Sequence, residues 1–97
     1  YKYSKKKNYQ LKGVIMETLN TTGSMSRVQY DDVTLLYSYS TIVGYVKDGK
    51  AIITNHYYSN TTNRHLYNFR EMYGVNKEDT FELGAFYKRA ELDGVRV

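Results

Sequence analysis

The sequence contains no cysteine, no proline and no tryptophan, and it has no long apolar run. Without cysteine the chain can form no disulfide and offers no thiolate metal ligand, so it suits a reducing compartment. A membrane-spanning helix needs roughly 20 consecutive apolar residues, and no stretch approaches that length or matches a signal peptide. We therefore expect a cytoplasmic protein that has no membrane partner.

Residues suited to catalysis or metal binding are scarce as well. The two histidines, His56 and His65, show neither HxxxH nor HxH spacing. The acidic pairs at 31–32 and 78–79 lie in predicted turns, where neighbouring side chains diverge, so we expect solvated loops rather than an acid–base pair. No GxSxG frame surrounds a serine. We expect no catalytic residues, no metal site and no cofactor.

The chain does have an excess of positive charge and of tyrosine. Its formal net charge is +4, to which Lys5, Lys6 and Lys7 contribute most. They lie in the stretch 1–8, which lacks apolar periodicity and is predicted to be a flexible basic arm, and residues 9–97 are predicted to form a single α+β domain. Such an arm can neutralise phosphates, but a merely solvated chain end has the same composition. The 12 tyrosines suit binding surfaces and small cores alike.

Alternating apolar positions predict strands in the middle of the chain. Residues 25–30 form a first candidate strand, which turns at an Asp-Asp pair into a second at 33–39. Within the second, side chains two residues apart face one way, as in a half-buried strand. We interpret the tyrosines of this sheet, Tyr37, Tyr39 and Tyr45, as core residues in preference to binding residues.

A hairpin is the clearest turn in the sequence. Asp48-Gly49 separates two β-rich runs, 41–47 and 50–54, and Asp-Gly suits a type I′ turn because both central residues need positive φ. The alternation slips at 38–41, which predicts a bend, a bulge or a short turn there.

One helix is predicted at about 61–73. Its apolar face repeats at helical spacing and consists of Leu66, Phe69, Met72 and Tyr73. The polar run 59–62 offers several N-cap side chains, and Gly74 stands where a left-handed C-terminal residue is needed. A short helix is also expected to open at 77–79, capped by Asn76.

Three segments keep more than one interpretation. Residues 9–19 fit a helix or a short strand, and 81–90 fit a helix that Gly84 weakens. The last residues, 92–97, fit an edge strand or a frayed end. The predicted fold is therefore α+β: a small antiparallel sheet of roughly three to five strands with a central hairpin at about 41–54. The main helix packs on it, and a short C-terminal helix follows in one interpretation of 81–90.

Candidate binding residues gather around the main helix. They are tyrosines and cations, together with one histidine: Tyr57, Tyr58, Arg64, His65, Tyr67 and Arg70, to which the lysines of the basic arm are added. A helix start rich in hydroxyls and followed by Arg64 is suited to an anion, and an exposed tyrosine can stack on a nucleic-acid base. The alternative interpretation is structural, with one tyrosine pointing inward and the histidine packed beside Leu66.

The stretch from about 36 to 69 resembles an uncharacterised family of small phage and plasmid proteins. The residues that carry the resemblance are SYSTIV at 38–43, YSNTTNRHL at 58–66 and Phe69, which match the pattern SY-[SN]-T…YS-x-TT-x-[KR]-H…F. The resemblance implies an accessory protein of a bacterial mobile element, located in the cytoplasm of the host cell. It implies no catalytic residues, and it covers neither the basic arm nor the C-terminal part.

Three functions agree with these observations. The first is a non-catalytic protein that binds host or mobile-element nucleoprotein machinery, such as a nucleic-acid-targeting defence effector, in the manner of an anti-CRISPR inhibitor. The second is a direct DNA- or RNA-binding protein that uses the basic arm and the tyrosine and arginine side chains. The third is an interaction or assembly subunit, for example a homodimer that pairs through a sheet edge.

Overall fold

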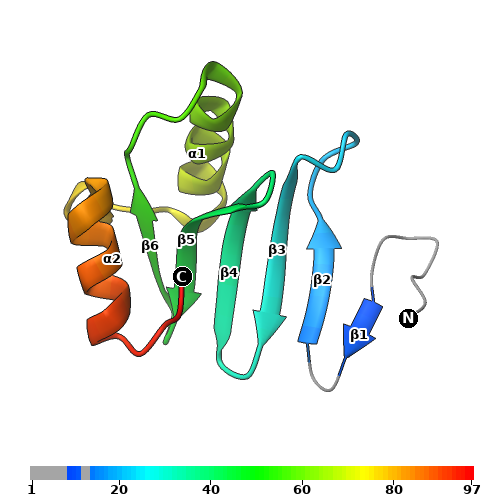
Figure 1. The fold of residues 1–97 in the computed structure, drawn as a ribbon, viewed down its shortest axis with the longest axis horizontal. Coiled ribbons are helices and arrows are strands. Elements are labelled where there is room, and N and C mark those ends of the chain that lie inside the picture. Colours follow the sequence, from blue (N-terminus) through cyan, green and yellow to red (C-terminus); the bar gives the residue numbers. More distant parts are fainter. Residues whose placement is uncertain (1–8, 12–13) are drawn as a thin grey trace.

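The computed structural model describes residues 9–11 and 14–97, so the predicted basic arm with Lys5, Lys6 and Lys7 lies outside the described residues. Within them the chain forms a seven-stranded sheet and two α-helices, and the α+β fold class is confirmed (Figure 1). The strands are β1 (Tyr9–Leu11), β2 (Val14–Thr18), β3 (Met25–Tyr30), β4 (Val33–Ser38), β5 (Thr41–Lys47), β6 (Lys50–Thr54) and β7 (Thr80–Phe81). None of the described helices is long and apolar enough to cross a membrane.

The strands lie side by side in chain order. The first six form an antiparallel meander, and β7 joins the far edge parallel to β6. The sheet is larger than the predicted three to five strands. Within 9–19 the described residues form the strands β1 and β2 rather than a helix, and β7 has only two residues, too few to show any periodicity.

Tight turns join the central strands. Asp48 and Gly49 have φ values of 54° and 75°, so the hairpin with a type I′ turn is confirmed. The predicted irregularity near 38–41 is a two-residue turn between β4 and β5, next to a register shift after Leu36. Tyr39 lies in this turn with a φ of 57°. The shift explains why the apolar alternation of β4 does not continue into β5.

The main helix, α1 (Asn60–Tyr73), matches the predicted range within one residue. The Ser59 hydroxyl accepts the backbone N–H of Thr62, and Gly74 ends the helix in the left-handed conformation. Leu66 and Phe69 are buried as predicted, but Met72 is 49% exposed and its assignment to the core face is wrong. The buried stripe starts earlier instead, at Thr62 and His65, because hydroxyl and imidazole groups find hydrogen-bond partners under this helix.

The segment 81–90, which the sequence left open, forms most of a second helix. A 3₁₀ turn (Lys77–Asp79) follows Asn76, although the Asn76 side chain makes no capping hydrogen bond. The second helix, α2 (Leu83–Leu92), begins after Glu82, whose carboxylate accepts the N–H groups of Gly84 and Ala85. Gly84 is therefore tolerated because it lies in the capped first turn. The tail beyond α2 has no strand, and its Val95 is buried in the core.

The two helices cover opposite faces of the β4–β7 part of the sheet (Figure 1). On one face α2 packs through Phe86 and Ala90 against a cluster that includes Val33, Leu35, Tyr45 and Ile52. On the other, α1 packs through Leu66 and Phe69 against Met25, Leu36, Val43 and Ile53. Strands buried on both faces explain why β5 and β6 are nearly continuous apolar runs.

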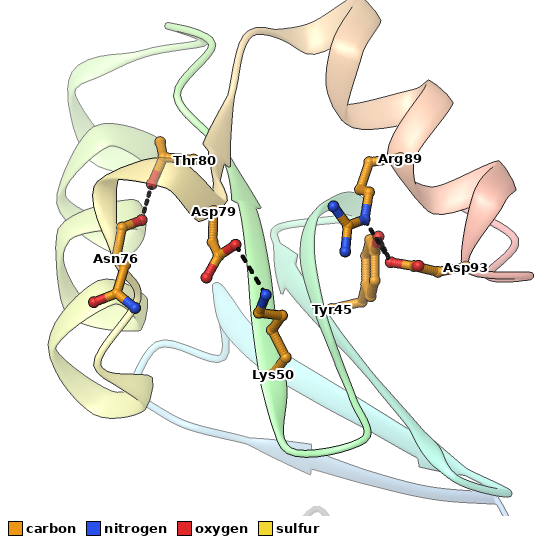
Figure 2. A network of polar contacts seen from close by, with 7 residues as sticks. All are labelled: Tyr45, Lys50, Asn76, Asp79, Thr80, Arg89 and Asp93. Atoms are coloured by element: carbon orange, nitrogen blue, oxygen red, sulfur yellow. Dashed lines mark hydrogen bonds and ion pairs between the residues drawn. The ribbon is translucent and has the colours of Figure 1, made fainter.

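A polar network anchors the end of α2 to the sheet (Figure 2). The Tyr45 hydroxyl donates to Asp93 Oδ2 at 2.7 Å, and Arg89 Nε donates to the same oxygen at 3.1 Å. The Lys47 ammonium donates to the backbone carbonyl of Asp93 at 2.7 Å. Burial of its ring, and then the bond to Asp93, raise the pKa of Tyr45 far above its usual value. The raised pKa favours the neutral phenol, which donates this hydrogen bond.

We expect Tyr45→Phe to lower the free energy of unfolding by about 1.5 kcal/mol, because a partly buried hydrogen bond to a carboxylate is lost while the ring packing stays. Urea unfolding followed by circular dichroism measures this change. Tyr67→Phe removes an exposed hydroxyl and serves as the matched control, with a change below about 0.5 kcal/mol. Equal effects of the two variants would show that the bond to Asp93 adds no stability.

Candidate functional site

An open groove runs along the exposed side of α1. Its other wall is formed by the β2–β3 loop and the β4–β5 turn, which meet α1 at the same end of the sheet (Figure 1). We call it the α1 groove; its volume is about 960 Å³. Arg64, Tyr67 and Arg70 come from the helix, and Tyr39 and Asn20 from the other wall. None of the described residues that line it is an aspartate or a glutamate.

His65 forms the buried base of the groove wall. Its Nδ1 lies 2.7 Å from the Ser38 hydroxyl, which is itself 2.8 Å from the hydroxyl of Thr62. Its Nε2 lies 3.3 Å from the hydroxyl of Ser24. Burial, followed by the nearby charge of Arg64, lowers the pKa of His65. The ring is therefore neutral at pH 7, with one nitrogen donating and the other accepting, and it joins α1 to β4 and to the β2–β3 loop.

The β2–β3 loop has its own hydrogen bonds. Asn20 Nδ2 donates to the Ser24 hydroxyl at 3.0 Å, and Asn20 Oδ1 accepts the backbone N–H of Met25 at 3.2 Å. The Thr22 and Ser24 hydroxyls lie 2.8 Å apart. The backbone N–H of Tyr39 donates to the carbonyl of Ser24 at 2.6 Å, and this hydrogen bond connects the β4–β5 turn to the β2–β3 loop. This wall of the groove is therefore preorganised.

Ser24 and His65 are neighbours, and serine and histidine together can form a nucleophile and its general base. Their separation of 3.3 Å is long for such a pair. The second ring nitrogen faces the Ser38 hydroxyl instead of a carboxylate that would stabilise a charged imidazole. The geometry is that of a structural cluster. In the described part of the chain no group of three or more His, Asp or Glu side chains is placed to hold a metal ion.

The structure separates the residues predicted as binding residues into three groups. Arg64, His65, Tyr67 and Arg70 all line the α1 groove, although His65 is only 5% exposed. Tyr57 does not line the groove, but its hydroxyl donates at 2.7 Å to Oδ1 of Asn60, which does.

Tyr58 belongs elsewhere. Its ring meets that of His56 edge-on at 4.6 Å, and burial together with a hydrogen bond to Tyr87 raises its pKa. Tyr87 lies on α2, so Tyr58 takes part in the contact between that helix and the segment before α1. The lysines of the basic arm lie outside the described residues.

Several groove residues were missed from the sequence. Tyr45 is fully buried as predicted and Tyr37 is partly buried, but Tyr39 is 56% exposed, and its interpretation as a core residue is wrong. The β4–β5 turn begins after Ser38 and ends the alternation of inward and outward side chains along β4. The Tyr39 ring therefore does not pack in the core. The asparagines and hydroxyls of the β2–β3 loop were recognisable as a polar loop, but no local signal places them beside α1.

The chain belongs to a family of unknown function (DUF8033), whose model matches residues 2–85. No curated protein and no solved structure matches it. The matched range contains every residue that lines the α1 groove, whereas most of α2 lies beyond it.

Proposed function

We propose that this protein is a non-catalytic nucleic-acid-binding accessory protein and that the α1 groove holds the phosphate backbone. The observation that carries the proposal is the charge of the groove: among the described residues, Arg64 and Arg70 line it and no carboxylate does. Arginine guanidinium groups bind phosphate oxygens in bidentate geometry, and each neutralised phosphate releases counterions. A net charge of +4 acts in the same direction.

The remaining polar groups of the groove support the same ligand. Asn63 and Asn68 project from α1, and Asn20 and Thr22 stand across from them. Amide and hydroxyl groups contact phosphates, sugars and base edges in protein–nucleic-acid complexes. A protein-binding hot spot would instead centre on a desolvated apolar or aromatic pocket, and this groove is open and mostly polar.

The proposed setting is the nucleoprotein machinery of a bacterial cell or of its mobile elements. A protein of this kind would act by occupying a nucleic-acid strand that another complex needs, and inhibition of a nucleic-acid-targeting defence effector is one such action. The support for this setting is the resemblance over residues 36–69 together with the charge of the groove.

Binding of the full chain to labelled single- and double-stranded DNA and RNA across a salt series tests the proposal. We expect Arg64→Ala and Arg70→Ala each to weaken binding and to reduce the slope of log K against log salt by about 0.7–0.9, the contribution of one phosphate contact. Arg96→Ala is the matched control, because it removes an equal charge from an exposed position outside the groove.

Three results would contradict the proposal. Absence of binding at low salt would exclude nucleic acid as the ligand and direct the search to a protein partner. Equal losses for Arg64→Ala and Arg96→Ala would make the effect one of net charge. If the double variant at Arg64 and Arg70 bound as the wild type does, binding would belong to the Lys5–Lys7 arm instead of the groove.

A further inference from the structure

Tyr39 has an unusual backbone conformation for its residue type. Its φ of 57° lies in the left-handed region, which bulky side chains rarely adopt because Cβ crowds the following carbonyl. The other non-glycine residues with positive φ in the described chain are Asp31 and Asp48, and aspartate tolerates this conformation well. Glycine or asparagine would suit the turn better than tyrosine. The backbone of the turn therefore does not explain a tyrosine at this position. We look for the explanation in the contacts of its ring.

The ring of Tyr39 is held in place but not covered. It packs at 5.7 Å against the His65 ring with an interplanar angle of 52°, and the backbone of Tyr39 is bound to Ser24. Even so, 56% of the residue is exposed, on the wall of the α1 groove. A rigid, exposed aromatic ring is the arrangement that stacks on a planar ligand at low entropic cost.

Tyr67 provides a second ring in the same groove. It lies on α1 and is 58% exposed. Arg64 and Arg70 precede and follow it by three residues, the spacing at which helix side chains are neighbours. The groove thus combines two stacking surfaces with cations placed to contact the phosphates beside a stacked base.

We propose that the α1 groove binds single-stranded nucleic acid, with bases stacked on Tyr39 and Tyr67 and phosphates held by the two arginines. This inference rests on the proposed function and makes it more specific. In a duplex the base faces are covered by their neighbours, so a duplex offers the groove its phosphates alone. Because an aromatic ring can stack on any base, the groove should distinguish single strands from duplexes but should not distinguish one base sequence from another.

Tyr39→Gly and Tyr67→Leu test the stacking. Glycine adopts the left-handed conformation of the turn freely and leucine favours a helix, so both variants are expected to fold; circular dichroism and thermal melting check this. Tyr39→Asn is a second variant with the same purpose, since asparagine also tolerates the left-handed region. Tyr87→Ala is the matched control, because it removes an exposed ring from α2, away from the groove.

The probes are a single-stranded oligonucleotide, its duplex, and a single strand of equal length whose central nucleotides are abasic. We expect the wild type to prefer the single strand, and each tyrosine variant to bind it about tenfold more weakly, the loss of one stacked base. Binding to the duplex should change less than twofold. The abasic strand lacks both stacked bases, so the wild type should bind it about a hundredfold more weakly, as weakly as the double variant at Tyr39 and Tyr67 binds the intact strand.

The outcomes separate this inference from the proposed function. Equal losses for single strand and duplex, or an abasic strand that binds as tightly as the intact one, would overturn stacking while leaving a phosphate-binding groove. A wild type that binds none of the probes at low salt would overturn both. A loss for Tyr87→Ala equal to that for Tyr39→Gly would show that the groove is not where bases stack.

Discussion

Replacing His65 by alanine is expected to lower the free energy of unfolding by about 2–4 kcal/mol, since the change empties a buried volume and removes the imidazole that forms a hydrogen bond with the buried Ser38 hydroxyl. His65 is 5% exposed and contacts Ser38 and Ser24, so it connects α1 to β4 and to the β2–β3 loop. Urea unfolding measures the loss. His56→Ala changes the other, exposed histidine and should cost less than about 0.5 kcal/mol.

We also expect His65 to make the free energy of unfolding depend on pH. Burial and the charge of Arg64 lower the pKa of His65 in the folded protein, whereas the unfolded chain titrates near the ordinary value of about 6.5. Below that pH the unfolded state binds more protons, so the free energy of unfolding falls as the pH drops through 6.5 and on toward the folded pKa. The contribution of the neutral His65 ring to the free energy of unfolding is therefore fully present above about pH 6.5.

His65→Gln removes the titrating group and keeps hydrogen-bonding capacity, so its stability should vary less than that of the wild type between about pH 7 and pH 5. Thermal melting at several pH values compares the two proteins, with His56→Gln as the matched substitution at the exposed histidine. A wild-type curve that stays flat across this interval would contradict the placement of a neutral, buried imidazole at this position.

Gly44→Ala is the second substitution with a large expected effect. A Cβ at this position would lie 2.9 Å from the backbone oxygen of Ile52 and 3.2 Å from Cδ1 of Leu36. The first contact is with the backbone of the neighbouring strand, so β5 and β6 would have to move apart in the middle of the sheet. We expect the free energy of unfolding to fall by about 1–3 kcal/mol.

Gly84→Ala makes the identical chemical change in α2 and serves as its control. There the added Cβ approaches no backbone atom outside α2; its one close neighbour is Oε1 of the Glu82 side chain, at 3.2 Å. Because alanine favours a helix over glycine, stability should stay equal or rise by up to about 1 kcal/mol. Denaturant unfolding of both variants gives the comparison, and an equal loss in the two would refute the crowding at Gly44.

Local patterns were enough to predict several elements of this protein. The turn at Asp48-Gly49, the end of α1 at Gly74 and its start within the run 59–62 all depend on residues next to one another in the chain. Each is decided by a backbone conformation or a capping hydrogen bond that spans at most a few residues. Arg64, Tyr67 and Arg70 could be selected for the same reason, as exposed cations and rings on one predicted helix.

The tertiary structure decided what lies opposite α1. Periodicity carries no information about contacts between residues far apart in sequence, and Ser24 meets His65 across 41 positions. The exposure of Tyr39 depends on a turn that ends the strand alternation, and His65 is held by hydroxyls of Ser38 on β4 and Ser24 in the β2–β3 loop. The sequence by itself therefore determined the elements and the chemical character of the helix surface. Only packing could bring the β2–β3 loop, the β4–β5 turn and α1 together as one groove.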